Sequence, residues 1–241
     1  MNAKLHGCTL DLEMPYFACF RRPASTSVML TYPVPPFTTI LGLIANALGV
    51  PRPAYTPMIT WLQETLRLNL RPLKAPGRPN RELAKILKLV GEVREERLPS
   101  SFPSSPMHKY FLACVSYRVY LAASDPDEIE EIAAALRRPA RPLYLGQSDD
   151  LVIVTVSWQG EALEEESALA WGLVSGVHEA EGQRVEVLRL PLAFEGERAL
   201  KYTPVVSLPE HFPLHLKEPV SMWRFGKETV PLFPTEEGDH A

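Results

Sequence analysis

Apolar positions along the chain recur with the two periods that distinguish strands from helices. Alternating or continuous apolar runs predict five strands, at residues 4–12, 66–72, 108–121, 151–158 and 184–190. Helical spacing predicts five helices, at residues 40–48, 58–65, 80–93, 126–136 and 163–174. The pattern therefore predicts an α+β protein, with strands and helices interleaved through the first two thirds of the chain.

The predicted helix at 40–48 follows an approach rich in proline, TYPVPPFTT. Proline fixes φ and favours an extended residue before it, so the helix can begin only after this run. Thr38 or Thr39 is expected as the N-cap, and Gly49 as the left-handed residue that ends the helix. The helix is apolar on all sides, which predicts burial, and it has about half of the ~20 residues that a membrane span needs.

Two other elements have a distinct polar side. In the strand at 66–72, Arg67, Asn69 and Arg71 alternate with leucines, which predicts a basic, outward-facing surface. The helix at 126–136 is expected to be capped by Ser124 or Asp125, with a proline in its first turn. Both elements are therefore expected to bury only their apolar side.

The order of elements gives the expected domain organisation. Residues 1–158 read as strand, helix, strand, basic insertion, strand, helix and strand, a ferredoxin-like βαββαβ arrangement also used by RNA-recognition domains. The insertion is expected at about 73–109. Residues 159–241 are expected to form a smaller β-rich region, either a second small domain or an extension of the first.

Charge is distributed unevenly over the 241 residues, although the net charge is only −4. Residues 21–110 contain 13 Lys and Arg against 5 Asp and Glu, whereas residues 111–241 contain 11 against 22. Such a chain can bind a polyanion with one part and repel it with the other, and the alternative is two ordinary solvated faces.

Motifs for metal or cofactor chemistry are missing from the sequence. Its three cysteines form no CxxC pair, which argues against a disulfide framework or a zinc site and fits a reducing cytoplasm. No phosphate-binding glycine motif and no GxSxG motif occurs. We therefore expect no metal and no cofactor.

Aromatic and basic residues are interleaved before the central helix. Tyr16, Phe17 and Phe20 precede Arg21 and Arg22. Rings stack on unpaired bases and guanidinium groups pair with phosphates, so the segment is suited to single-stranded RNA, although three aromatics beside a strand are also common in a core. The arginines are expected to close over the N–H groups at the start of the central helix, forming an anion-binding corner.

Three segments resemble the fifth family of CRISPR-associated proteins, a branch of the RAMP superfamily, and are closest to members from type I-A or I-B systems. They are FACFRRPASTSVMLTYPVPPFTTILGLIANALG, HKYFLACVSYRVYL and LRRPARPLYLGQSDDLV, at residues 17–49, 108–121 and 136–152. The resemblance implies a ferredoxin-like domain with a thumb-like insertion. The basic segment 67–97 is where a thumb would be.

The resemblance also implies a function and partners. Such proteins hold the 5′ handle of the guide crRNA in the Cascade surveillance complex, where they cap the backbone. They lie beside the backbone subunits of family seven and the large subunit of family eight, and they meet target DNA through the complex. A cytoplasmic protein without membrane association is implied.

The residues expected to bind RNA are Arg21, Arg22, Thr38, Thr39, Arg71, Lys74, Arg78, Arg81, His108 and Lys109. The alternative is a metal-independent endoribonuclease that processes precursor crRNA, as in the type I-C branch, which uses Tyr, Lys and His side chains. Here His108 and Lys109 would have that role. Because adjacent strand residues point to opposite faces, a third member such as Tyr32 would have to join them. We expect binding without catalysis.

Overall fold

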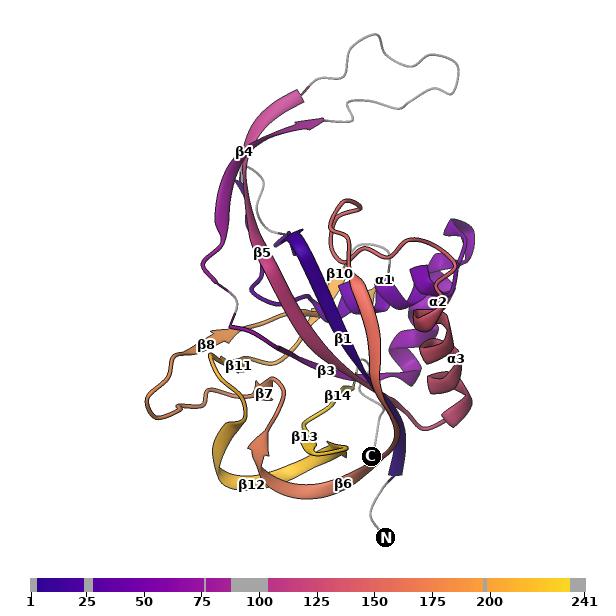
Figure 1. Cartoon of the computed structure of the whole chain (residues 1–241), viewed down its shortest axis with the longest axis vertical. Coiled ribbons are helices and arrows are strands. Elements are labelled where there is room, and N and C mark those ends of the chain that lie inside the picture. The colour runs from indigo at the N-terminus through magenta and orange to yellow at the C-terminus, as the bar shows by residue number, and fades with distance from the viewer. Residues whose placement is uncertain (1–3, 24–27, 76, 88–103, 197–198, 235–241) are drawn as a thin grey trace.

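The computed structural model describes residues 4–23, 28–75, 77–87, 104–196 and 199–234. Three long antiparallel strands and the shorter β3 lie at its centre in the order β6-β1-β5-β3. Their bounds are β1 Lys4–Ala18, β3 Arg67–Pro72, β5 Ser104–Ala123 and β6 Ile153–Ala170. This sheet is the frame on which the other elements are placed (Figure 1).

Three helices cover one face of the sheet: α1 Phe37–Ala47, α2 Tyr55–Thr65 and α3 Pro126–Arg137, with a short 3₁₀ helix at Arg52–Ala54 (Figure 1). Leu10 and Leu12 of β1 lie opposite Val119 and Tyr117 of β5, and all four side chains are buried in one cluster with the apolar residues of the helices. The predicted mixture of helices and strands is confirmed, and the core is the layer between the helices and the sheet.

The central helix is where the sequence predicts it, but it starts earlier. α1 begins at Phe37, directly after the last proline, because the carbonyl of Pro36 already accepts hydrogen bonds from the N–H groups of Thr39 and Ile40. The predicted cap by Thr38 or Thr39 is therefore wrong, and both threonines lie in the first turn. Gly49 has the expected positive φ, +72°, just beyond the helix.

The helix at 126–136 is confirmed in detail. Asp125 is its N-cap and accepts a hydrogen bond from the N–H of Asp127 at 2.9 Å. The aliphatic side chains at the predicted spacing are the buried ones. The predicted helix at 58–65 is also confirmed as α2, although it begins at Tyr55.

The predicted helix at 80–93 is wrong over the residues that the structure describes. Asn80–Leu87 forms strand β4, which pairs antiparallel with the first half of β5, and residues 88–103 lie outside the described part. The free edge of β5 supplies hydrogen-bond partners for the backbone of this segment. The side chain of Leu83 is 68% exposed, so the described residues offer no apolar surface here for the apolar side of a helix to cover. The expected basic insertion is thus built at least partly from a β-hairpin.

The C-terminal part is built from strands and contains no helix at 163–174. β6 continues through those positions to Ala170 because β12 pairs with it, Met222 lying opposite Glu165. β6 is also continuous across residues 158 and 159. The strands are β7 Val174–Ser175, β8 Val185–Leu188, β9 Pro191–Glu195, β10 Ala199–Tyr202, β11 Val206–Pro209, β12 Leu214–Phe225, β13 Glu228–Val230 and β14 Phe233–Pro234.

These strands attach to the central sheet at both of its edges. β12 and β13 extend it beyond β6, and β14 pairs with β3 at the other edge. β7, β11 and β8 form a separate three-stranded sheet, and β9 pairs with β10. The C-terminal part thus wraps around the central strands (Figure 1).

A network of charged side chains joins the open face of the sheet to β13. Arg118 donates two hydrogen bonds to the carboxylate of Asp11, at 2.7 and 2.8 Å, and also contacts Glu228 at 3.2 Å. Arg71 donates to Glu228 at 2.7 Å and to the hydroxyl of Tyr120 at 2.9 Å. Glu228 therefore neutralises the charges of two arginines, the buried Arg71 and the half-buried Arg118.

The expected basic, outward-facing side of β3 is consequently wrong. Asn69 and Arg71 are buried, and only Arg67 is partly exposed. The side-chain amide of Asn69 both donates to the carbonyl of Leu173 and accepts from its N–H, each at 2.9 Å. Residues of the C-terminal part cover this face at β3, which the pattern of β3 alone could not indicate.

The turn at residues 146–150 fixes the segment that follows β1. Asp150 is fully buried, and its Oδ2 accepts hydrogen bonds from the N–H groups of Cys19, at 2.8 Å, and Gln147, at 3.1 Å. Gly146 has φ +111°, and a Cβ there would lie 3.0 Å from both Asp150 Oδ2 and the carbonyl oxygen of Cys19. Burial raises the pKa of Asp150, while these two hydrogen bonds oppose the rise.

Removing the carboxylate of Glu228 should destabilise the fold. Glu228→Ala leaves the buried guanidinium of Arg71 and the half-buried guanidinium of Arg118 without their common partner, so we expect the free energy of unfolding to fall by about 3 kcal/mol. Urea denaturation at neutral pH measures it. Glu166→Ala, on the exposed part of β6, is the matched control and should change stability by less than about 0.5 kcal/mol. Equal stability of the two variants would contradict the role of the network.

Asp150 should make stability depend on pH. Asp150→Ala leaves the buried N–H of Cys19 and the partly buried N–H of Gln147 without their acceptor and should lower the free energy of unfolding by about 3 kcal/mol, whereas Asp150→Asn keeps an oxygen acceptor and should lose less. Because the pKa of Asp150 is raised, the folded protein holds this proton more tightly than the unfolded chain. Its contribution to stability is complete below the ordinary pKa of about 3.9 and is lost as the pH rises through the raised pKa.

Urea denaturation at a series of pH values tests this assignment. The stability of the unmodified protein relative to Asp150→Asn should fall as the pH rises across that window. A difference that does not change with pH would show that burial leaves the carboxyl group unperturbed.

Candidate nucleic-acid interface

A β-sheet arm projects from the central sheet. It consists of β4, the first half of β5 and the short strand β2 Val28–Met29, which pairs in parallel with β5 (Figure 1). The second half of β5, by contrast, lies between β1 and β3 in the core. One continuous strand therefore carries the arm and anchors it.

Several of the sequence-predicted residues lie on this arm or in the loop that leads to it. Lys74 and Arg78 are exposed in the loop between β3 and β4. Arg81 is exposed on β4, opposite Tyr110 of β5, and His108 is exposed on β5, opposite Leu83. Arg81 and His108 thus lie on the arm itself, and Lys74 and Arg78 lie in the loop that leads to it.

Lys109 is placed differently from its neighbour His108. Its side chain points inward and is 8% exposed, and its Nζ lies 5.4 Å from the centre of the Phe17 ring. The lysine charge also lowers the pKa of the buried Cys19 and Asp150, whose pKa values burial raises. The positive charge of Lys109 therefore favours the ionised forms of Cys19 and Asp150 at the root of the arm.

A β-bulge brings aromatic side chains to the surface at the same root. Pro15 and Tyr16 lie opposite Cys114 alone, where the pairing of β1 with β5 shifts, and Cys114 has φ +52°. Tyr16 is 66% exposed, and Phe17 packs edge-to-face on Phe111 with ring centres 6.3 Å apart. The sequence left open whether these aromatics are core or surface.

The structure divides the three aromatics that precede the arginines. Phe20 is 1% exposed and packs on Tyr117 in the core, whereas Tyr16 and Phe17 are surface residues. The exposed pair lies where β1 ends and the arm begins. We name Tyr16, Phe17 and Phe111 the aromatic platform.

The two arginines after β1 are held by backbone pairing with the strand-like segment that precedes α1. Arg21 forms a β-bridge with Thr31. Arg22 donates from its backbone N–H to Leu30 at 2.9 Å and from its Nε to the carbonyl of Thr31 at 3.2 Å. Its guanidinium lies 4.9 Å from the centre of the Tyr32 ring. This segment is therefore rigidly positioned.

Tyr32 is buried against the C-terminal part of the chain. Burial is the main cause that raises the pKa of its hydroxyl, and the neighbouring Tyr202, which shares a hydrogen bond with it, raises the pKa further. A cavity of about 280 Å³ adjoins the pair, and Arg22 and Arg189 both line it. Neither His108 nor Lys109 is among its described lining residues. The structure thus does not unite the three residues of the cleavage alternative around this cavity.

Other predicted residues lie apart from the arm. Arg71 is engaged with Glu228 below the open face of the sheet, and Thr38 and Thr39 are half-buried in the first turn of α1. Sequence reasoning missed Arg189 and Tyr202. They lie well over a hundred residues from Arg22, and nothing in their spacing indicates that the fold brings them together.

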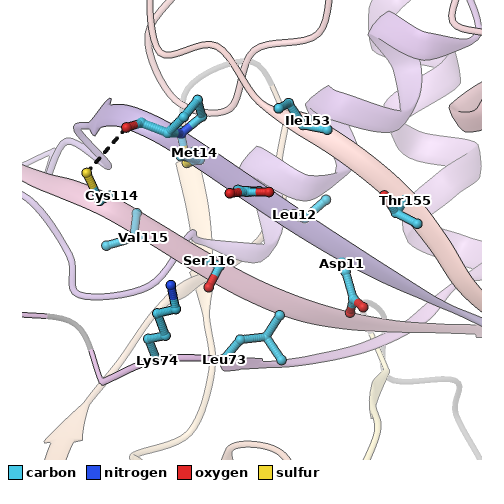
Figure 2. Close-up of a pocket in the computed structure, with 12 residues that line it drawn as sticks. Asp11, Leu12, Met14, Leu73, Lys74, Cys114, Val115, Ser116, Ile153 and Thr155 are labelled. Carbon is cyan, nitrogen blue, oxygen red and sulfur yellow. Dashed lines mark hydrogen bonds between the residues drawn. The ribbon is translucent and has the colours of Figure 1, made fainter.

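A second cavity, of about 480 Å³, lies on the open face of the sheet (Figure 2). Strands β1, β5 and β6 contribute Asp11, Ser116 and Thr155, and Lys74 reaches it from the loop after β3. Glu13 also lines it, and Asp11 is paired with Arg118, so the charges around the cavity balance and a single lysine is the only cation among its described lining residues. This charge balance makes it a poor site for a polyanion.

The described part of the chain contains no group of three or more His, Cys, Asp or Glu residues placed to hold a metal ion. Among its helices, none combines the length and the apolar character of a membrane span.

Comparison with known proteins identifies relatives at the level of family and fold. No curated protein matches the sequence significantly. One similar solved structure, described as a CRISPR RNA-guided surveillance complex, has 16% identity and a TM-score of 0.52 over 89% of this chain and 91% of that chain. A CRISPR protein from Archaeoglobus fulgidus has 14% identity and a TM-score of 0.54 over 95% and 99%. These likenesses show a shared fold.

The sequence model of the family described as CRISPR-associated protein (Cas_Cas5) matches residues 9–219, which is most of the chain. The resemblance found in the three sequence segments is thereby confirmed, and the chain belongs to this CRISPR-associated family.

Proposed function

We propose that this protein is an RNA-binding subunit of a Cascade surveillance complex and that it holds the 5′ handle of the crRNA without cutting it. The observation that carries the proposal is the arm, which combines exposed cations with an aromatic platform at its root. The structural neighbour described as an RNA-guided surveillance complex supports the same assignment at the level of fold.

The arm has the chemistry that single-stranded RNA requires. Residues 73–87 contain four Lys and Arg and one Glu, and all four cations are exposed. Cations along a strand can follow the phosphates, and exposed rings such as Tyr16 can stack on bases of any sequence. A polyanion that contacts the arm, the loop before it and the aromatic platform at its root therefore meets both kinds of group.

The opposite end of the molecule is acidic. β6 carries the run Glu164–Glu166 where it pairs with β12, far from the arm along the long axis (Figure 1), whereas Glu161 lies outside that pairing and is bound to Lys4. Arg224 pairs with Glu165 at 2.9 Å, which neutralises part of this charge. The remaining carboxylates repel RNA from this end, and this favours RNA at the arm.

The order of elements along the chain, β1-α1-β3-β5-α3-β6 with β4 inserted, supports a ferredoxin-like assignment for the first part of the protein. We infer an RNA-binding domain at 1–158, with a thumb at about 73–109, and a C-terminal region at 159–241. The backbone and large subunits, and target DNA through them, are the proposed partners in the cytoplasm.

Removing cations from the arm should weaken RNA binding. For the double variant Arg78→Ala and Arg81→Ala we expect at least a tenfold loss of affinity for the processed crRNA, because each phosphate contact contributes about 1.5 kcal/mol or more. The salt dependence of log K should also become shallower by about 0.7 for each phosphate that the variant no longer neutralises. Fluorescence anisotropy at several salt concentrations measures both.

Arg138→Ala is the matched control for this experiment. It removes an exposed arginine at the end of α3, away from the arm, and should leave affinity within about twofold. RNA binding that is undetectable, or that does not respond to salt, would reject the proposed function. Equal reductions in affinity for the two variants would place the RNA elsewhere than on the arm.

The protein should not cleave precursor crRNA. His108 is exposed, whereas Lys109 points inward over Phe17 and Tyr32 is buried beside Tyr202, so acid–base groups do not surround one cavity. Incubation with a precursor repeat RNA in the presence of a chelator, followed by denaturing electrophoresis, tests this. A single discrete cut that disappears in His108→Ala would instead establish a metal-independent endoribonuclease.

A further inference from the structure

The cavity beside Tyr32 is formed by two distant parts of the chain. Arg22 and Tyr32 come from the segment before α1, whereas Glu186, Arg189 and Tyr202 come from the strands of the C-terminal part. Its volume of about 280 Å³ is at the small end of ligand pockets, which begin at roughly 300 Å³. The cavity therefore has room for a single nucleotide unit, and the neighbouring units of a longer RNA would lie outside it.

The two arginines of this cavity are held in the same way. Arg22 donates from Nε to the carbonyl of Thr31 at 3.2 Å, and Arg189 donates from Nε to the carbonyl of Thr203 at 3.0 Å. Each guanidinium also lies over a tyrosine ring, that of Arg22 over Tyr32 and that of Arg189 over Tyr202 at 5.8 Å. These contacts fix the direction of each guanidinium fork.

The support of Arg189 is itself rigid. Thr203 is fully buried and exchanges two hydrogen bonds with Leu190, through its N–H at 2.9 Å and through its Oγ1 at 3.0 Å. None of the ion pairs among the described residues involves Arg189, although it is exposed beside a cavity. A preorganised arginine of this kind is suited to a phosphate.

Glu186, which also lines the cavity, requires that the ligand present a hydrogen-bond donor. An ionised carboxylate only accepts hydrogen bonds, and it would repel a phosphate unless the ligand also presents a donor. The ribose 2′-hydroxyl is the donor that every ribonucleotide has and that a deoxyribonucleotide lacks. Cations for the phosphate and an acceptor for the sugar thus stand around one cavity.

We propose that this cavity holds one ribonucleotide of the bound RNA, with its phosphate between Arg22 and Arg189 and its 2′-hydroxyl donating to Glu186. The inference rests on the proposed RNA-binding function and extends it, because the C-terminal part becomes a component of the RNA site and a source of selectivity for RNA over DNA.

Binding of a fluorescently labelled oligoribonucleotide of about ten nucleotides tests the phosphate contact. Arg189→Ala should weaken it about tenfold and make the salt dependence shallower by about 0.7. Arg184→Ala, an exposed arginine that does not line this cavity, is the control and should stay within about twofold. Arg189→Gln keeps an amide donor for Thr203, so it should fold normally and still lose the affinity.

The same oligonucleotide with deoxyribose tests the sugar contact. Glu186→Ala should reduce the preference for RNA over DNA about tenfold, whereas the exposed control Glu210→Ala should leave it unchanged. If the unmodified protein binds no RNA, the proposed function fails and this inference with it. If it binds RNA while Arg189→Gln matches Arg184→Ala, or Glu186→Ala keeps full selectivity, the function stands and the single-nucleotide site is refuted.

Discussion

Backbone pairing along both edges of β5 is the constraint on which the rest of the structure depends. Its second half pairs with β1 and β3, which fixes the sheet that the helices cover, and its first half pairs with β2 and β4 to make the arm. A strand of 20 residues spans roughly 65 Å, more than the core alone can use. The surplus length is what projects as the arm.

The sequence correctly predicted helix ends that are determined by their own residues. Asp125 and the proline after it specify the start of α3, and Gly49 specifies the end of α1, because capping and left-handed φ are properties of single positions. The spacing of aliphatic residues likewise predicted the buried side of α3. These features need no knowledge of distant partners.

Elements whose state depends on a distant partner were predicted poorly. β4 and the end of β6 have helical spacing, yet each is a strand because β5 and β12 offer backbone partners. Arg71 alternates with leucines like a surface residue, yet Glu228, more than 150 residues later, turns it into a buried one. A pattern within one segment cannot show what covers its polar side.

The candidate site, too, has one part that the sequence predicted and one part that depends on distant partners. Its arm follows from the basic composition of residues 67–97, and four exposed residues, Lys74, Arg78, Arg81 and His108, belong to that stretch or lie beside it in the arm. Arg189, by contrast, meets Arg22 only through the path of the C-terminal strands. Composition thus locates a charged segment, whereas a cavity with directed groups requires the fold.

The bulge at Cys114 divides β5 into two parts with different neighbours. On the core side its partners are β1 and β3 and most of its side chains are buried, whereas on the arm side its partners are β2 and β4 and more of its side chains are exposed. Local unfolding of the arm breaks only the hydrogen bonds between the strands of the arm. Unfolding of the core also disrupts β5, on which the arm is built. Amide hydrogens of the arm should therefore exchange through local opening, and those of β1 and the second half of β5 through global unfolding. The protein thus has a hierarchy of cooperative units within a single strand.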